Sequence, residues 1–485
     1  MHSLCDKKQS PNQPDNVTSM PDKIKHDLSA TATSDNKSTS VPFRKLMEIA
    51  RACLIAASVL AVLIIFAGDI DGMATGKIDI TYSLGCSLVS YSAGFIRRGL
   101  LGEIIQHMDV LFQPFLSITI LASVSLLFIL WVILAGMIRL RIKLPYILAV
   151  IFSPSLIMMQ RGGNFIHNDA LLVALNLAAS CLLARLLFYR AQKSPEKTSF
   201  PRMLALDFVI LVPLTASALI HELSSTLLPP VMLLFLAYAR KVHRTMHAAA
   251  VSVLLIILYA VMMTCFKYAD PDAIAESWTG IYTDSDSFRY NTALLNTADK
   301  VHALNCLEMT LTLLKECALA YIPQLLLAVA VPFALLLLSG ITIFHSSSSR
   351  AMKARCLLIL SCLCPLGLCI AGGDFGRWFS ICAINLTAYS LLIAHPAGRT
   401  EADGRSSEKD RMVRSIMKQS AAIIIAVVLL NFRLDVNGYF SESEQPFSEE
   451  AKETAANASN LIRDLKPLIT REIVLQPQNG AKRFD

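Results

Sequence analysis

The chain has 485 residues, of which 54% are hydrophobic and 17% charged, and its formal net charge is +7. Its mean hydropathy is +0.52. These values exclude a single soluble globule and favour a polytopic membrane protein. The positive charge requires no nucleic-acid partner, because the basic residues gather in short loops between apolar segments.

The N-terminal segment differs in composition from the rest of the chain. Residues 1–44 are rich in Ser, Asp, Asn, Lys and Pro and have no apolar face, which predicts a disordered cytoplasmic tail. The first apolar run, 49–67, starts far from residue 1 and has no small-residue cleavage site. We therefore expect it to remain as a membrane span and not to act as a cleaved signal peptide.

Apolar runs dominate residues 45–432. A span needs roughly 20 such residues to cross a hydrocarbon core of ~30 Å, and about eleven runs approach that length. This predicts an all-α fold, a polytopic transmembrane helix bundle, followed by a tail at 433–485. The predicted spans are 49–67, 113–137, 144–160, 170–188, 203–220, 225–239, 247–266, 318–343, 356–371, 379–395 and 419–432.

The orientation of the bundle follows from its basic residues. Clusters such as Arg139, Arg141 and Lys143 follow every second predicted span. Lys and Arg concentrate in cytoplasmic loops, so we expect the N-terminus inside and the tail at 433–485 outside. The chain is thus predicted to be a multi-pass integral membrane protein.

The remaining connections fall on the external face and mix charges with glycine and aromatic residues. Ionisable groups close to a membrane are costly and often mark functional sites. The polar side chains of these loops are therefore candidate functional residues. They are 68–112, 160–169, 220–225, 267–317 and 372–380.

The first external loop carries two acids and two arginines. Asp69 and Asp71 form a D-x-D pattern that offers either a general base or ligands for a divalent cation such as Mg²⁺ or Mn²⁺. An acidic turn at a helix end is the simpler alternative. Arg97 and Arg98 precede "LLGEIIQHM", whose apolar spacing predicts a helix along the membrane surface. Their guanidinium groups suit phosphate oxygens or, alternatively, lipid headgroups.

Two short loops carry further titratable residues. His221 and Glu222 interrupt an apolar hairpin, and either side chain is able to transfer a proton. Arg161, His167 and Asp169 crowd the loop 160–169, where two glycines let the backbone approach a ligand. We assign the first pair to candidate catalysis and the other three to candidate substrate binding. Ordinary turn or anchor residues are the alternative for each position.

The last two external loops combine charge with aromatic rings. In "GGDFGRW", Asp374 and Arg377 are three residues apart, so a helix starting there sets them on one face as an ion pair. Arg377 and Trp378 also suit contacts with a phosphate and a sugar ring. The loop 267–317 is acidic and carries five aromatic residues, which fit either stacking on pyranose faces or packing on the bundle.

This layout resembles the GT-C superfamily of membrane glycosyltransferases, which take a sugar from a polyprenyl-phosphate carrier at the external face. The resemblance rests on the eleven-span arrangement, the acidic first external loop and the surface helix after it. It implies that Asp69 and Asp71 supply the catalytic base or hold a metal. It also implies a carrier-phosphate site drawn from four arginines, namely Arg97, Arg98, Arg161 and Arg377.

Three segments, "AGFIRRGLLGEI", "HELSS…PP" and "GGDFGRW", also resemble elements of bacterial surface-polysaccharide assembly proteins, including polymerases. The expected function is transfer of polyprenyl-linked sugars to a glycan or lipid acceptor at the periplasmic face, by a single-sugar transferase or a polymerase of the cell envelope. Membrane lipids are expected partners, and nucleic acid is not.

Two other classes remain open. A transporter or flippase for a lipid-linked or anionic solute often shows internal repeats and polar groups at mid-membrane. No convincing repeat is visible, and the charges gather at one face. A structural membrane protein without catalytic activity is the other alternative. It predicts that single charged residues of the external loops can be changed with little effect. No P-loop occurs in the sequence, so coupling to a nucleotide is not expected.

Overall fold

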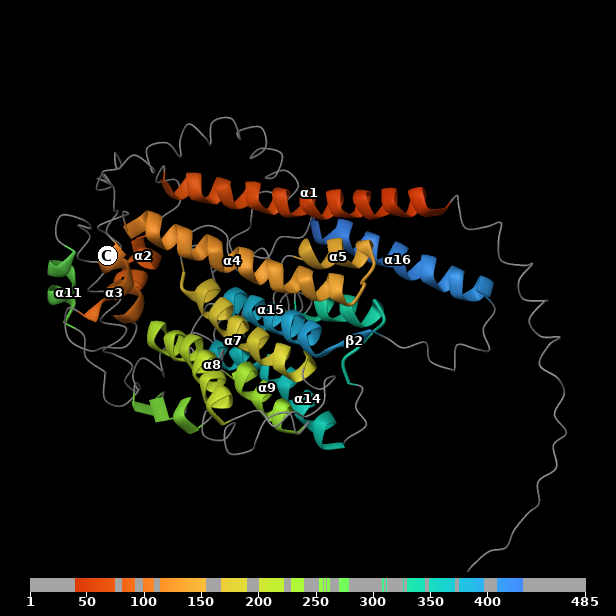
Figure 1. Cartoon of the computed structure of the whole chain (residues 1–485). Helices are drawn as coiled ribbons and strands as arrows, with labels where there is room; N and C mark the ends of the chain where they lie inside the picture. The colour runs from red at the N-terminus through yellow and green to blue at the C-terminus, as the bar shows by residue number, and fades with distance from the viewer. Residues whose placement is uncertain are drawn as a thin grey trace, which may run out of the picture. The chain divides into compact units, whose positions relative to one another are not determined.

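Figure 1 shows the computed structural model of the whole chain. It falls into two units, residues 1–57 and residues 58–485. In the first unit the described part is the beginning of helix α1 (Ser40–Ala74), which continues into the second. The structure describes residues 40–74, 81–91, 99–108, 114–153, 167–189, 200–221, 228–239, 270–278, 329–344, 349–370, 375–396 and 408–430, with a few isolated positions between 253 and 326.

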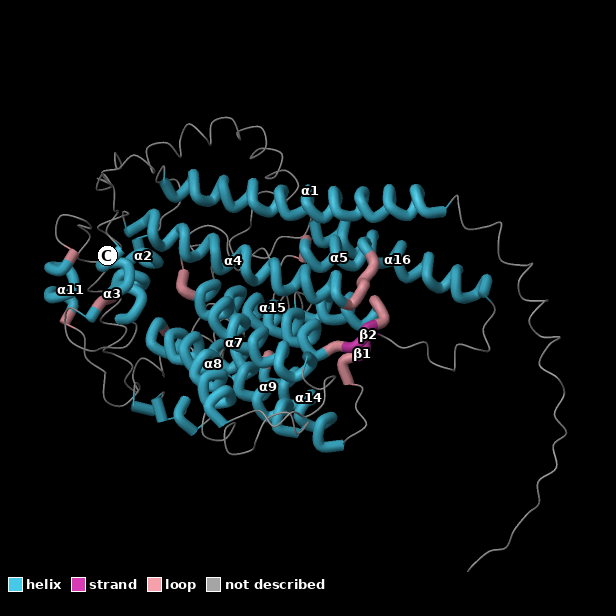
Figure 2. Tube along the Cα trace, in the orientation of Figure 1, coloured by secondary structure: helices cyan, strands magenta, loops and turns pink. Residues whose placement is uncertain are grey.

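The described part of the second unit is mostly helical, as Figure 2 shows. Its remaining α-helices are α2 (Thr81–Leu88), α3 (Gly99–Met108), α4 (Pro114–Arg139), α5 (Leu144–Ile151), α7 (Asp169–Tyr189), α8 (Phe200–Ile220), α9 (Leu228–Ala239), α11 (Pro271–Ser277), α14 (Ser349–Ser361), α15 (Phe375–Ile393) and α16 (Glu408–Leu430). A 3₁₀ helix covers Cys364–Ile370.

Two very short strands are the exception to the helical pattern. β1 (Ile341–Thr342) pairs antiparallel with β2 (His395–Pro396), with Ile341 opposite Pro396. This pairing brings the chain after residue 338 next to the chain after α15. The buried Arg355 of α14 donates a hydrogen bond to the carbonyl of Ile343, just beyond β1.

Helix α4 illustrates why the sequence forms a long apolar helix. Proline stands at its first position, where its missing N–H costs nothing, and the helix ends at Arg139 before Arg141, which has a φ of 55°. By length and composition, α4 and the stretch Glu48–Gly68 of α1 are the two helices in the described part of the chain that are able to cross a membrane. The two helices give weak support to a membrane location.

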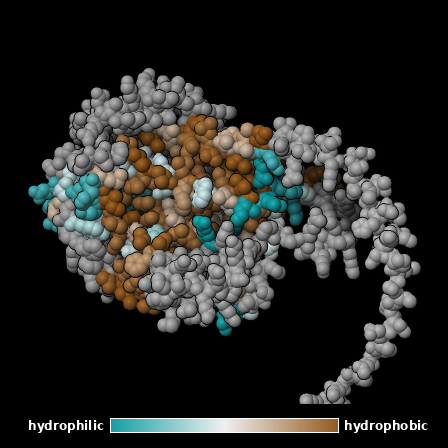
Figure 3. Space-filling view, viewed as in Figure 1, coloured by the Kyte–Doolittle hydropathy of each residue, from teal (hydrophilic) through white to brown (hydrophobic). Residues whose placement is uncertain are grey.

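One face of α4 exposes large apolar side chains. They recur at helical spacing while the opposite face is buried, and Trp131 in the middle is 60% exposed. In water such a stripe is unfavourable, but lipid tails cover it at no cost. Figure 3 shows the same side of the molecule as Figure 1. Hydrophobic residues cover much of this side of the described structure, and hydrophilic ones gather near α11 and near β2. The stripe consists of Ile120, Val124, Leu127, Trp131 and Ile138.

The centre of the second unit is formed by α4, α7 and α15, which pack against one another (Figure 1). α15 is buried on nearly all sides between Arg377 and Ala394. At its C-terminal end, Leu391 lies against Gly136 of α4, and Arg139 donates hydrogen bonds to the carbonyls of Leu391 and Leu392. The guanidinium group therefore satisfies carbonyls that the end of a helix leaves unpaired.

α7 and α15 run parallel, as two cross-links along their interface show. Asp169 pairs with Arg377 near the N-terminal ends. The Ser180 hydroxyl lies 2.8 Å from the Tyr389 hydroxyl. Ser180 is eleven residues after Asp169, and Tyr389 is twelve residues after Arg377, so the two helices advance together. Their N-terminal ends consequently lie on the same side of the bundle.

Several predicted boundaries need correction. α1 begins at Ser40, inside the segment expected to be a disordered tail, and continues to Ala74 beyond the predicted span end at residue 67. The predicted span 318–343 leaves its helix at Leu338, because Gly340 adopts a φ of 87° and strand β1 follows. The run 356–371 is not one helix: α14 ends at Ser361 and the chain tightens into a 3₁₀ helix at Pro365.

The other predicted spans are described to different extents. α7, α8, α15 and α16 begin earlier than the spans predicted for them, at Asp169, Phe200, Phe375 and Glu408. α5 covers the span 144–160 as far as Ile151, and the residues after 153 lie outside the described part. The span 247–266 is described at isolated positions, and the tail 433–485 is outside the description. Eleven spans and the inside-outside orientation therefore stay predictions.

Candidate functional site

The most notable polar contact is a buried ion pair at the N-terminal ends of α7 and α15. Arg377 Nε donates to Asp169 Oδ2 at 2.8 Å, and the two side chains are only 7% and 3% exposed. Asp169 is the first residue of α7, where the helix dipole favours a negative charge. The pairing joins residues 208 positions apart in the sequence.

Two histidines belong to the surroundings of this pair. Arg377 Nη2 lies 3.3 Å from His167 Nδ1, and His167 is buried. Burial alone raises the pKa of Asp169, but Arg377, His167 and His221 together lower it to about 2. Asp169 is therefore a carboxylate at neutral pH and accepts hydrogen bonds without taking up a proton.

Two polar atoms beside the guanidinium group of Arg377 lack a hydrogen-bond partner. One is the acceptor Asp169 Oδ1, and the other is the donor Trp378 Nε1; both are buried. The guanidinium carbon of Arg377 lies 5.2 Å from the centre of the Trp378 ring, a cation–π distance. Buried polar atoms without partners are uncommon in proteins and often indicate a bound water or ligand.

Residues from α2 and α11 support the site from one side. Ser87 donates to Asn168 Oδ1 at 2.9 Å, and both residues are buried. Asn168 stands between the two site residues His167 and Asp169, so this hydrogen bond holds that turn against α2. The fully buried Trp278, which follows α11, donates from Nε1 to the carbonyl of Leu88 at 2.9 Å.

Helix α3 packs closely on the same segment. A Cβ atom on Gly102 would lie 2.1 Å from the Val89 carbonyl oxygen, so only glycine permits this approach. Together α2, α3, α11 and the residues 89–91 form what we term the α2–α3–α11 cluster. The cluster joins the first predicted external loop to the loop 267–317.

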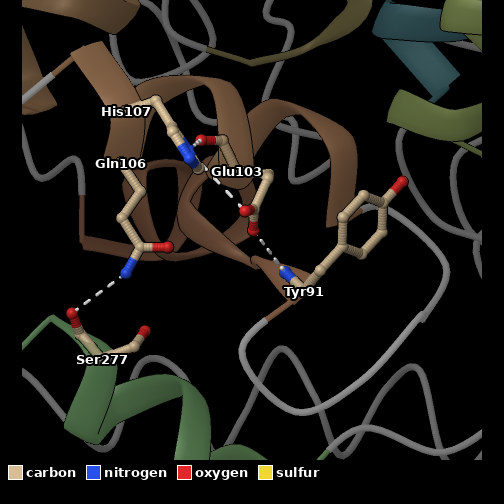
Figure 4. A network of polar contacts seen from close by, with 5 residues as sticks. All are labelled: Tyr91, Glu103, Gln106, His107 and Ser277. Carbon is tan, nitrogen blue, oxygen red and sulfur yellow. Dashed lines mark hydrogen bonds and ion pairs between the residues drawn. The ribbon is translucent and has the colours of Figure 1, made fainter.

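Polar contacts of α3 complete the α2–α3–α11 cluster, as Figure 4 shows. Glu103 accepts a hydrogen bond from the Tyr91 backbone N–H at 3.2 Å, and Gln106 donates to the Ser277 carbonyl at 3.3 Å. His107 Nδ1 lies 2.9 Å from the Glu103 carbonyl oxygen. Burial and the charge of Glu103 raise the pKa of Tyr91 to about 12. Tyr91 therefore stays neutral at physiological pH.

The structure brings together part of the candidate residues chosen from the sequence. Arg377 contacts both Asp169 and His167, and His167 and His221 lie close enough to affect Asp169 electrostatically. These residues come from three loops that the sequence assigns to the external face, and Ser87 and Trp278 come from the other two. The side of the membrane that this end faces stays a prediction.

The other candidates are not placed. The backbone of Asp69 and Asp71 lies in α1, but their side chains are outside the described part. Arg97, Arg98, Arg161, Glu222 and Asp374 also lie outside the described residues. The expected pairing of Arg377 with Asp374 therefore remains untested, whereas its pairing with Asp169 was not foreseen.

The described site does not suit a divalent cation at Asp169. One carboxylate oxygen is already bound to Arg377, whose charge repels a second cation. Among the described residues, His, Cys, Asp and Glu form no group of three or more able to hold a metal ion. The side chains of the D-x-D motif lie outside that description.

Sequence reasoning missed two of the residues that position the site. Ser87 and Asn168 are uncharged and occur in no recognisable motif. Trp278 is one of the five aromatic residues of the loop 267–317, and its complete burial agrees with the packing expected as one alternative for them. The signal present was weak: Asn168 stands inside the charged "IHND", and Ser87 precedes a short apolar stretch in a polar loop. Comparison of the chain with protein-family models, curated sequences and solved structures gives no match.

Proposed function

We propose that this chain is an integral membrane glycosyltransferase that acts at the external, periplasmic face on polyprenyl-phosphate-linked sugars in cell-surface glycan assembly. The observation that carries the proposal is the buried Asp169–Arg377 pair with its two histidines, at the end of the bundle where the charged loops meet. The acceptor is a glycan or a lipid, and the enzyme is a single-sugar transferase or a polymerase.

The exposed apolar surfaces support a membrane location. α4, α8, α14 and α16 all expose large apolar side chains, while serine, threonine and asparagine side chains are buried between α4, α7 and α15. This distribution is the reverse of that in a water-soluble helical protein. The sequence pattern of spans and basic loops supports a multi-pass arrangement, and the resemblance to surface-polysaccharide assembly proteins supports a bacterial inner membrane.

Glycosyl transfer involves three chemical changes. The bond between the sugar C1 and the carrier phosphate breaks, a bond from C1 to the acceptor oxygen forms, and the acceptor proton moves to a base. Histidine is the commonest general base in enzymes, so His221 is a candidate for the base, and Asp69 and Asp71 are further candidates. Asp169 is too strongly stabilised as a carboxylate to serve, so its role in this scheme is to bind and orient.

Phosphate binding is assigned to the other three arginine candidates of the sequence. The Arg377 charge is balanced by Asp169, which leaves Arg97, Arg98 and Arg161 as the residues expected to hold the polyprenyl phosphate. Arg97 and Arg98 directly precede α3 in the sequence, and two adjacent arginines suit a lipid phosphate at the membrane boundary.

A transfer assay tests the proposal. Proteoliposomes containing the purified chain and radiolabelled polyprenyl-phosphate sugars should form a new lipid-linked or polymeric glycan without any ion gradient. Asp169→Asn should lower the rate by about 10²-fold through misplaced substrate. The exposed carboxylate Glu276, changed to Gln, is the matched control and should retain full activity. Product formation that equals protein-free liposomes for all donors tested refutes the function.

A transporter or flippase is the second candidate, and polar side chains between α7 and α15 favour it. Asn176 and Asn385 each lie one helical turn before the Ser180–Tyr389 contact, at matching levels of two parallel helices. All four residues are buried. Movement of an unmodified fluorescent lipid-linked sugar between leaflets, with no new glycosidic bond, identifies this function in the same proteoliposomes.

A further inference from the structure

The geometry around Arg377 points to a binding site for the hydroxyl groups of an uncharged sugar, formed by Asp169 Oδ1 and Trp378 Nε1. This inference rests on the proposed function in taking a sugar as the ligand, and it assigns this site to the sugar and not to the carrier phosphate. The site consists of one hydrogen-bond acceptor, one hydrogen-bond donor and one aromatic ring.

The acceptor half of the site is Asp169. Its Oδ2 atom is bound to Arg377, while its Oδ1 atom is buried and has no hydrogen-bond partner. A buried carboxylate oxygen without a hydrogen-bond partner has lost its hydrogen bonds to water and gained none in return, which costs free energy of folding. A ligand O–H group that donates to Oδ1 removes this cost.

The donor half is the indole N–H of Trp378. The side chain is 9% exposed, and Nε1 has no partner. An indole nitrogen only donates, so its ligand must present a lone pair. A hydroxyl group is able to donate to Oδ1 and to accept from Nε1, so a molecule with several hydroxyl groups satisfies both atoms.

Charge selects among the ligands that offer these groups. The ion pair has no net charge, so it provides no excess positive charge for an anion, and the Asp169 carboxylate repels a phosphate. The guanidinium group of Arg377 repels an added cation. A neutral molecule with several hydroxyl groups is left, and it satisfies Asp169 Oδ1 and Trp378 Nε1 without adding charge.

Ligand-induced thermal stabilisation tests the site without requiring turnover. The full chain is purified in an amine-oxide detergent, because maltoside detergents carry sugar headgroups themselves. Its melting temperature is followed against methyl glycosides of glucose, galactose and N-acetylglucosamine, and against inorganic phosphate and diphosphate. At least one glycoside should raise Tm by about 3 °C at ten times its apparent Kd, with saturation.

Three variants separate binding from general effects. Sugars stabilise proteins as excluded osmolytes, but that effect grows steadily with concentration and does not depend on one side chain. The saturable shift should vanish in Asp169→Asn, because the single amide oxygen is taken by the Arg377 donor and an NH₂ group then replaces the acceptor at the ligand position. It should fall at least threefold in Trp378→Phe, which keeps an aromatic ring but removes the donor. It should persist in Glu276→Gln. Trp378→Phe keeps the test valid even where Asp169→Asn does not fold.

The outcomes distinguish this inference from the proposed function. Saturable stabilisation by phosphate and by none of the glycosides overturns the sugar site. A glycoside shift that survives in both Asp169→Asn and Trp378→Phe also overturns it, because the sugar then binds elsewhere. No saturable shift with any probe means that water alone occupies the site, which equally refutes it. If the chain transfers sugars but no glycoside gives a saturable shift, the proposed function stands and the sugar site is wrong. If a glycoside binds saturably but no transfer occurs, the sugar site stands and the proposed function is wrong.

Discussion

The ion pair between Asp169 and Arg377 should behave as an energetically coupled unit. Both side chains are almost fully buried and 2.8 Å apart, so removing one partner leaves an uncompensated charge in the bundle. Asp169→Asn or Arg377→Met should each cost about 3–5 kcal/mol. The loss in Asp169→Asn includes a smaller part, about 0.3–1 kcal/mol, from the dipole at the start of α7. The double variant leaves no charge and should be close to the wild-type protein, within about 2 kcal/mol.

Thermal unfolding in detergent measures this coupling. Each single variant should lower Tm by about 5–10 °C, and the double variant should recover most of that loss. Glu276→Gln, an exposed carboxylate on α11, is the control and should leave Tm unchanged. Single variants that melt with the wild-type protein, or a double variant that shows the sum of both losses, contradict a buried and coupled pair.

The remaining predictions address pH, packing and topology. The pKa of Asp169 is about 2, below its ordinary value of 3.8. The ion pair therefore adds about 2 kcal/mol to the free energy of unfolding above pH 4, and this contribution is lost as the pH falls towards 2. The Tm of the wild-type protein should fall over this pH range, and the Tm of Asp169→Asn should not show this fall. Gly102→Ala should lower Tm by several degrees because its Cβ collides with the Val89 carbonyl, whereas Gly367→Ala, with open space around it, should not. Trp278→Phe leaves the Leu88 carbonyl unpaired and should cost about 1–3 kcal/mol in denaturant unfolding; a loss under 0.5 kcal/mol argues against that hydrogen bond. Cysteines introduced at Gly76, Ser224 and Gly280 should react with impermeant reagents outside the cell, and those at Ser194 and Ser347 should not; reversal at two positions inverts the proposed active face.

Hydropathy located most of the described helices, because an apolar run of sufficient length has few other stable forms in a membrane. It did not locate their breaks. Pro365 and Gly367 stand within the run 356–371, and the structure changes there from α-helix to 3₁₀ helix. These residues are visible in the sequence, but the length of an apolar run takes no account of such breaks.

The partner of Arg377 was beyond sequence reasoning for a different reason. Helical spacing reports which residues are neighbours three or four positions apart, and it therefore suggested Asp374. The pairing with Asp169 depends on α7 and α15 packing in parallel, and no local pattern specifies that arrangement. The same holds for Ser87 and Asn168, whose contact depends on the position of α2.

Fluorescence quenching of Trp131 by brominated lipids tests most directly whether the bundle is embedded in a membrane, on which the whole account depends. The chain has three tryptophans, and Trp278 and Trp378 are buried, whereas Trp131 is 60% exposed on the apolar face of α4. It lies about 7 Å from the middle of that helix at 1.5 Å per residue. In proteoliposomes, bromines near mid-chain should quench the protein strongly, and Trp131→Phe should abolish most of that quenching. Equal quenching in the variant, or protection of Trp131 from lipid bromine but not from aqueous iodide, contradicts a membrane-spanning α4.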